Sequence, residues 1–429
     1  MSHRIRTGAR VDPTTDHNWA RFRRYWIGNL VSFIGDYFSI IAIPFVAFEL
    51  SRSAFVVGVV EFAEMAVTVA FGVQLGRAAD RGDLRVTLAT TDAARAALLG
   101  LTAVVVAATA PSAWWIAALA VALGALRSVH DGAEHRLVPS LLDDDERIVA
   151  ANARFGISDG AGQIVGSTLV GLVVGYGAVY AIGFDAVTFA FASAATWSIG
   201  AVGRAVSGRG VGDEPTTVTT PAEPATPTVT LRDTLAAIRD EDRFWRLLVV
   251  SGLSNITSVC FYGQFVVFAT TDLHIGGPQI GATFAIQGVG GVIASVAIDR
   301  GLRPAPRWQA IGPALIALVP IAAALTRSWP VTMIGFAIVG AAVARDMAVL
   351  GVAQHVGFDP DIQGRIAMIR RSVLYVLIAP GIVAAGAVAE RFGASALFIG
   401  TGIAGLAAPV AAVALGVHRV AHPASRATD

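Results

Sequence analysis

Three acidic residues stand inside long apolar segments of this 429-residue chain. Asp36 lies within the run 25–48, and Glu61 and Glu64 lie within the run 54–76. A charge at the centre of a membrane helix costs about 2.5–3.5 kcal/mol on insertion scales, so such residues usually have a function. Asp36 is a candidate for a carboxylate that gains and loses a proton. The alternative is a carboxylate that is held permanently in a salt bridge between helices. Glu61 and Glu64 share one helix face because they are three residues apart, and they could share a proton, bind a cationic substrate or lie in water.

The remaining charged residues in apolar segments offer less chemistry. Asp92 and Arg95 are also three apart, and we interpret them as a structural charge pair. His130, Glu134 and His135 form the one candidate for a metal or enzyme centre. His130 and Glu134 are one helical turn apart, but a third ligand with a fixed spacing is missing, so we expect a solvated loop here. The sequence therefore predicts no metal site, no cofactor and no enzymatic activity.

The composition places these residues in a membrane. The chain is 55% hydrophobic and 15% charged, against about 25% charged residues in soluble domains. A spanning helix needs about 20 mostly apolar residues, and helices satisfy their own backbone hydrogen bonds in lipid. We predict twelve such helices, at about 25–48, 54–76, 86–109, 113–131, 153–175, 178–203, 245–270, 279–299, 308–326, 330–350, 366–388 and 394–417. The predicted fold class is an all-α membrane protein with twelve transmembrane helices in two pseudo-symmetric six-helix bundles.

The basic residues predict the orientation of these helices. All 32 are Arg, and the loops that follow odd-numbered helices hold only Arg52, Arg327 and Arg391. Most of the others stand in the remaining loops and the termini, so the positive-inside rule places both termini in the cytoplasm. The net charge of +1 argues against a nucleic-acid partner.

A Pro- and Thr-rich segment at 208–230 divides the chain into two halves. We predict a six-helix bundle at 1–203, a cytoplasmic linker with a short interfacial helix at 204–243, and a second bundle at 244–429. The halves echo each other, since an Asp-Arg-Gly sequence follows the second helix of each half, at Asp80 and at Asp299. Repeated bundles joined by a linker are typical of transporters that alternate access by rocking.

The turn GRAADRGDLR at 76–85 resembles the loop 2–3 motif of the major facilitator superfamily, Gly-x-x-x-Asp-Arg-x-Gly-Arg-Arg/Lys. The matching residues are Gly76, Asp80, Arg81 and Arg85. Asp83 and Leu84 depart from the motif in a way that is similar to the branch of bacterial drug, macrolide and siderophore exporters. The stretches 24–36, 92–96 and 184–189 resemble the first, third and sixth helices of that branch.

The resemblance implies roles for several residues. Asp80 would hold the cytoplasmic end of helix 11 closed, with Arg370 and Arg371 as its candidate partners. Some antiporters of this superfamily link an Arg in helix 4 to proton transfer, but the surrounding motif is poor here, so we expect Arg127 to face the surface. The candidates for the substrate cavity are Trp26, Asn29, Asn255, Tyr262 and Gln264.

The sequence and the resemblance together predict a secondary transporter in the bacterial cytoplasmic membrane. We expect export of a lipophilic or amphipathic small molecule, such as an antibiotic, secondary metabolite or siderophore, in exchange for protons. The chain has no ATP-binding Gly-x-x-x-x-Gly-Lys motif, and we expect a monomer whose partners are substrate, H⁺ and lipid. The alternative is uptake of a nutrient, sugar or metabolite, which predicts a polar cavity. A membrane receptor or enzyme would need features that the sequence lacks.

Overall fold

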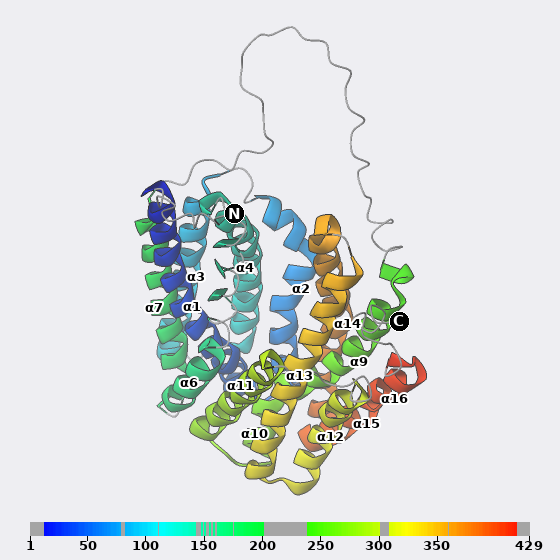
Figure 1. The fold of residues 1–429 in the computed structure, drawn as a ribbon. Helices are drawn as coiled ribbons and strands as arrows, with labels where there is room; N and C mark the ends of the chain where they lie inside the picture. Colours follow the sequence, from blue (N-terminus) through cyan, green and yellow to red (C-terminus); the bar gives the residue numbers. More distant parts are fainter. Residues whose placement is uncertain are drawn as a thin grey trace, which may run out of the picture.

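The computed structural model describes residues 13–78, 82–109, 111–142, 147–148, 150–151, 154–155, 158, 161–174, 176–200, 238–300, 309–358 and 360–417. Throughout these segments the regular elements are helices (Figure 1). The first half contains α1 (Pro13–Ser51), α2 (Ala54–Ala78), α3 (Leu84–Thr109), α4 (Ala113–Leu141), the π-helix η2 (Gly162–Gly166), α6 (Ser167–Val174) and α7 (Ala178–Ser198). The second half contains α9 (Asp242–Gly263), α10 (Phe265–Thr271), α11 (Gly277–Asp299), α12 (Ile311–Thr326), α13 (Trp329–Gly357), α14 (Pro360–Phe392), α15 (Ala394–Gly405) and α16 (Ala407–Ala414).

These elements correspond to the twelve predicted membrane helices. In the described part of the chain, 10 helices are long and apolar enough to cross a membrane, and α12 is a shorter apolar helix. The fifth predicted helix appears as η2 followed by α6, while Gln264 and Leu406 interrupt the seventh and twelfth. The prediction of an all-α membrane fold with two six-helix bundles is therefore confirmed. The boundaries assigned to the bundles and to the linker remain predictions, because residues 201–237 lie outside the described segments.

Several helices are longer than the predicted membrane segments, and two of them extend well past their predicted ends. The structure continues α4 from the predicted end at residue 131 to Leu141, and α13 from residue 350 to Gly357. Polar residues such as His130, Glu134 and His135 lowered the local hydropathy of the last turns of α4, although the helix continues through them. His130 and Glu134 consequently lie within a packed helix rather than in a solvated loop.

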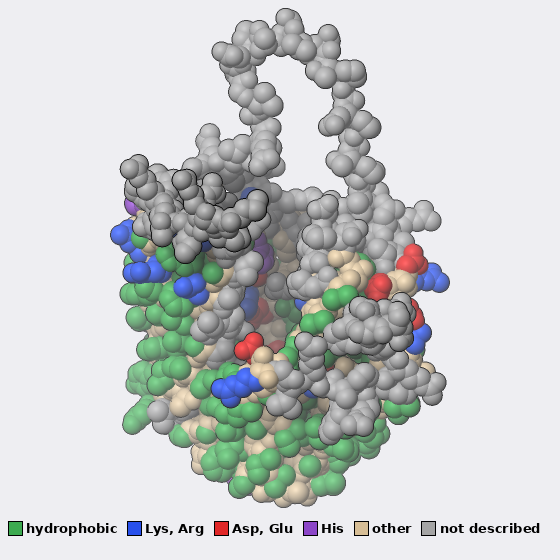
Figure 2. All heavy atoms as spheres, viewed as in Figure 1, with side chains coloured by type: hydrophobic (Ala, Val, Ile, Leu, Met, Phe, Trp, Pro, Cys, Tyr) green, Lys and Arg blue, Asp and Glu red, His purple; other side chains and the backbone are tan. Residues whose placement is uncertain are grey.

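On the face drawn in Figure 2, hydrophobic side chains dominate the sides of the helices. Several aliphatic side chains stand more than half exposed, among them Val104, Val187, Ile293, Leu325 and Val410. In water such a surface would be unfavourable, whereas lipid accepts it at no cost. Together with the spanning helices, it makes this a multi-pass membrane protein.

Equivalent helices approach closely in both bundles through glycine. A Cβ at Gly124 of α4 would lie 2.5 Å from the Glu64 carbonyl oxygen of α2. A Cβ at Gly290 of α11 would collide with the carbonyl oxygen of Ala337 in α13. Small residues allow membrane helices to pack backbone against backbone. The same pairing, second helix against fourth, thus recurs in each half.

The two bundles contact each other at the end of the molecule where α2 begins. There α2 packs against α14, and α11 packs against η2 and α6. The Ala54 backbone N–H donates to Glu390 Oε2 at 2.7 Å, and Gln264 Nε2 donates to the Ala54 carbonyl oxygen at 3.5 Å. At the opposite end, Figure 2 shows a hollow between the bundles with charged and histidine side chains inside it.

Candidate functional site

A cavity of about 270 Å³ lies between the two bundles, with walls from both. The first bundle contributes residues from α1, α2, α3, α4 and α7, and the second contributes residues from α9, α10, α11 and α14. The charged and polar lining residues include Asp36, Ser39, Glu61, Glu64, Arg95, Arg127, Asp185 and Tyr262. The apolar lining residues include Ile40, Val60, Met65, Leu99, Leu123, Phe189, Val259, Phe284 and Ile382.

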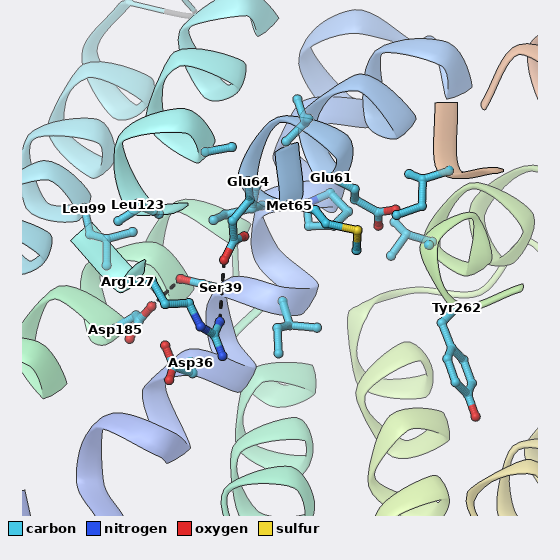
Figure 3. Close-up of a pocket in the computed structure, with 18 of the residues that line it drawn as sticks. Asp36, Ser39, Glu61, Glu64, Met65, Leu99, Leu123, Arg127, Asp185 and Tyr262 are labelled. Atoms are coloured by element: carbon cyan, nitrogen blue, oxygen red, sulfur yellow. Dashed lines mark hydrogen bonds and ion pairs between the residues drawn. The ribbon is translucent and has the colours of Figure 1, made fainter. Parts of the chain in front are cut away.

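Arg127 lies in this cavity and connects two of the predicted acids (Figure 3). Its Nη1 is 3.5 Å from Glu64 Oε1, and its guanidinium also points toward Asp36. The expectation that Arg127 faces the surface is therefore wrong. The close approach of α4 to α2 at Gly124 brings the arginine within reach of Glu64. Asp36, for which the sequence suggested no partner, has a cation beside it.

Asp185 is a further acid of the cavity that was not predicted as a site residue. It is fully buried on α7, and it accepts hydrogen bonds from Ser39 on α1 and from Thr188 Oγ1 at 3.0 Å. Arg95 lines the same wall, with its guanidinium 4.9 Å from the centre of the Phe189 ring. The signal in the sequence was an Asp in the middle of an apolar run, the same signal that identified Asp36.

Glu61 lies apart from Arg127, at the boundary between the bundles (Figure 3). Its carboxylate contacts Gly263, the last residue of α9, at the position that a Cβ would occupy. Within the described segments it forms no hydrogen bond or ion pair. Although Glu61 and Glu64 are three residues apart, one faces the second bundle and the other faces Arg127. The two acids therefore have different surroundings.

Asp92 and Arg95 have separate partners in the structure. Asp92 Oδ1 is 3.2 Å from His130 Nε2, and both side chains are buried. In the described part of the chain the ion pair of Asp92 is with this histidine of α4, while Arg95 covers an aromatic ring. The sequence could not distinguish these arrangements, because helix spacing shows which residues share a face but not which neighbouring helix covers it.

Of the five predicted cavity residues, the structure places only Tyr262 in the cavity lining. Trp26 Nε1 donates to Ser158 Oγ at 2.9 Å, and Asn29 Nδ2 donates to Glu134 Oε1 at 2.8 Å. Asn255 Nδ2 donates to the Ser251 carbonyl oxygen of its own helix, and Gln264 lies at the contact between the bundles. Trp26, Asn29 and Gln264 thus connect different helices, whereas Asn255 bonds within its own helix, and none of the four lines the cavity.

The loop 2–3 motif is described only in part. Gly76 belongs to the last turns of α2, whereas Asp80, Arg81 and the side chain of Arg371 lie outside the described part of the chain. Arg370 is partly buried on α14. Arg85 stays within its own bundle, where its guanidinium lies 4.8 Å from the centre of the Trp197 ring near the end of α7. The gate that the resemblance implies remains a prediction.

A family model described as Major Facilitator Superfamily matches residues 25–345. The chain belongs to this superfamily. No curated protein matches the sequence. Membership indicates a transporter rather than an enzyme, with a small-molecule substrate that binds within the membrane.

Solved structures of the superfamily share the fold of this chain. A bacterial homologue of the human lysosomal transporter Spinster, inward-facing and unoccupied, is 12% identical with a TM-score of 0.69, and the match covers 95% of this chain and 97% of that one. The nucleoside transporter NupG is 14% identical with a TM-score of 0.66, covering 92% and 99%. A bacterial homologue of the iron transporter ferroportin, inward-facing, is 13% identical with a TM-score of 0.68, covering 92% and 98%. At these identities the likeness shows the fold alone.

Proposed function

We propose that this superfamily member is a secondary active transporter that exports an amphipathic, cationic small molecule in exchange for protons. The observation that carries the proposal is the cavity between the bundles, where four carboxylates and two arginines stand among apolar side chains. Aliphatic and aromatic walls bind a lipophilic body, and the excess of carboxylates attracts a positive group. Drug-sized ligands commonly bind in such apolar pockets with a few polar groups.

Proton coupling is assigned to Glu61 and Asp36, which differ in environment. Glu61 contacts the second bundle without a cationic partner, so an apolar interface accommodates its neutral form, and the carboxylate ionises when that interface opens to water. Arg127 lies beside both Asp36 and Glu64. When a cationic substrate or a proton binds to one of these carboxylates, the interaction of Arg127 with the other carboxylate changes. Competition between substrate and proton for the same carboxylates is the physical basis of exchange.

The two bundles would alternate access by opening and closing at opposite ends. Contacts at Ala54, Gln264 and Glu390 support a state that is closed where α2 begins. The excess of Arg in the loops at the other end supports placing that end, with both termini, in the cytoplasm of a bacterium. In this assignment the cavity loads from the cytoplasm, as an exporter requires. One chain supplies every wall of the cavity, which supports a monomeric transporter.

Uptake of a neutral nutrient is less well supported. Sugar or nucleoside recognition needs several neutral hydrogen-bonding side chains in the cavity, because hydroxyl groups lose their water on binding. Asn29, Asn255 and Gln264, which the sequence offered for this purpose, instead bond to protein groups outside the cavity lining.

The test is transport in proteoliposomes with an imposed pH gradient. We expect a lipophilic cation such as tetraphenylphosphonium to move against the proton flux, and a neutral nucleoside to stay in place. Glu61→Gln and Asp36→Asn should abolish stimulation by the gradient, while Glu49→Gln, which changes an exposed acid of α1, should transport normally. If a broad panel of amphipathic cations is not moved, the export proposal is wrong. If both acid variants keep gradient-driven transport, the assigned coupling residues are wrong.

A further inference from the structure

A second cluster of ligating side chains lies on α4, beyond Arg127 toward the end of the helix. His130, Asp131 and Glu134 each offer one ligand atom, and these atoms all lie within 4.8 Å of one another. The helical repeat explains the central place of Glu134, which is four residues after His130 and three after Asp131 and so shares a helix face with each of them. His130 is buried, and the two acids are partly buried between helices.

The histidine of this cluster is oriented by a second carboxylate. His130 Nε2 is 3.2 Å from Asp92 Oδ1 on α3. Both side chains are buried, with 9% of the histidine and 4% of the aspartate exposed. Histidines that bind metals usually donate their other ring N–H to a carboxylate, which sets the tautomer and the ring orientation. With Nε2 bonded to Asp92, Nδ1 is the nitrogen available to a ligand.

Among the described residues, none donates a hydrogen bond to one buried oxygen beside the cluster. Asn29 on α1 is 6% exposed, and its Nδ2 donates to Glu134 Oε1 at 2.8 Å. The Oδ1 atom of the same amide is buried without a donor. A buried carbonyl oxygen left in this way is destabilising, and native proteins usually satisfy it with a partner, a water or an ion. Because the two atoms belong to one amide, the free oxygen stands at the edge of the cluster.

We propose that His130, Asp131, Glu134 and the Asn29 side-chain oxygen bind a divalent first-row transition-metal ion. One imidazole nitrogen with carboxylate and amide oxygens is a donor set that suits Zn²⁺ or Mn²⁺. A doubly charged cation would also offset the carboxylates of Asp92, Asp131 and Glu134 gathered between three helices. None of these four residues is among those that line the substrate cavity, so the site is distinct from it and does not depend on the proposed export function.

The experiment measures metal binding without transport. The full chain is purified with a tag that contains no histidine, stripped with a chelator, and titrated with Zn²⁺ and then Mn²⁺ by calorimetry. We expect one ion per chain. His130→Gln and Glu134→Gln should each weaken binding at least tenfold, and Asp92→Asn, which acts through the histidine, about 10-fold to 100-fold. His135→Gln is the matched control, because this exposed histidine lies on the same helix outside the cluster.

Several outcomes would overturn the proposal. The site is absent if the wild-type chain takes up no stoichiometric Zn²⁺ or Mn²⁺. It is wrongly placed if His130→Gln and Glu134→Gln bind as tightly as wild type, or if His135→Gln loses as much affinity as they do. Size-exclusion profiles identify variants that fail to fold. Glu134→Gln keeps the size of the side chain and one acceptor oxygen for Asn29, so it provides the comparison if His130→Gln is lost.

Discussion

Glu390 closes one end of the molecule by capping a helix of the other bundle, and its removal should favour the state open at that end. It lies near the end of α14, and its Oε2 accepts hydrogen bonds from the backbone N–H groups of Ala54, at 2.7 Å, and Phe55, at 3.4 Å. These are the first residues of α2, whose N–H groups have no partner within their own helix. The capping carboxylate also interacts favourably with the positive end of the helix dipole.

The structure sets the size of the expected effect. A hydrogen bond to a charged group contributes about 1.5–3 kcal/mol, and a charge at a helix terminus about 0.3–1 kcal/mol. Because Glu390 is exposed, solvent screens part of this electrostatic stabilisation. A glutamine at this position also keeps an oxygen that can accept a hydrogen bond from the helix N-terminus. For Glu390→Gln we therefore expect about 1 kcal/mol, which is roughly a fivefold shift toward the state open where α2 begins.

Spin-label distances between the bundles measure this shift. Cysteines at the exposed positions Tyr176 and Thr326, in a Cys260→Ala background, report the separation of the two bundles at this end. We expect the long-distance population to grow about fivefold in Glu390→Gln and to stay constant in Glu49→Gln, an exposed acid at the same end. Equal populations in both variants would refute the capping argument.

Three further variants test the packing around the site. Gly263→Ala places a methyl group where the Glu61 carboxylate lies. Gradient-driven transport should therefore fall at least tenfold, while the thermal unfolding midpoint should change little. Normal transport would contradict the assigned contact. Gly124→Ala forces a Cβ to within 2.5 Å of the Glu64 carbonyl oxygen and should destabilise the protein by about 1–3 kcal/mol. The measurement is the thermal unfolding midpoint in detergent, which should fall. An unchanged midpoint would argue against this packing. Arg85→Ala removes the guanidinium from its tryptophan and should lower the midpoint without changing the spin-label distances, since both partners belong to one bundle.

Individual acids illustrate how much of the site could be predicted. Asp36, Glu61 and Glu64 were found from the sequence because each interrupts an apolar run, and all three line the cavity. Asp185 gave the same signal but was not among the predicted site residues, although it lies in the same cavity. Arg127 was expected at the surface because the motif around it is poor, and its face of α4 could not be oriented from sequence. Membrane helices are apolar on most faces, so their periodicity is too weak to show which face is buried.

The sequence by itself determined the membrane class, the number of spanning helices and the acids that stand within them. Lipid imposes these features on each segment independently, through its length, its apolarity and the need to pair every backbone group. The tertiary structure alone decided which charges meet. Arg127 reaches Glu64, Asp92 reaches His130, and Glu390 reaches Ala54 across the bundles, because each pair comes from different helices. Such contacts depend on the rotation and approach of whole helices, which glycines such as Gly124 permit and no local pattern encodes.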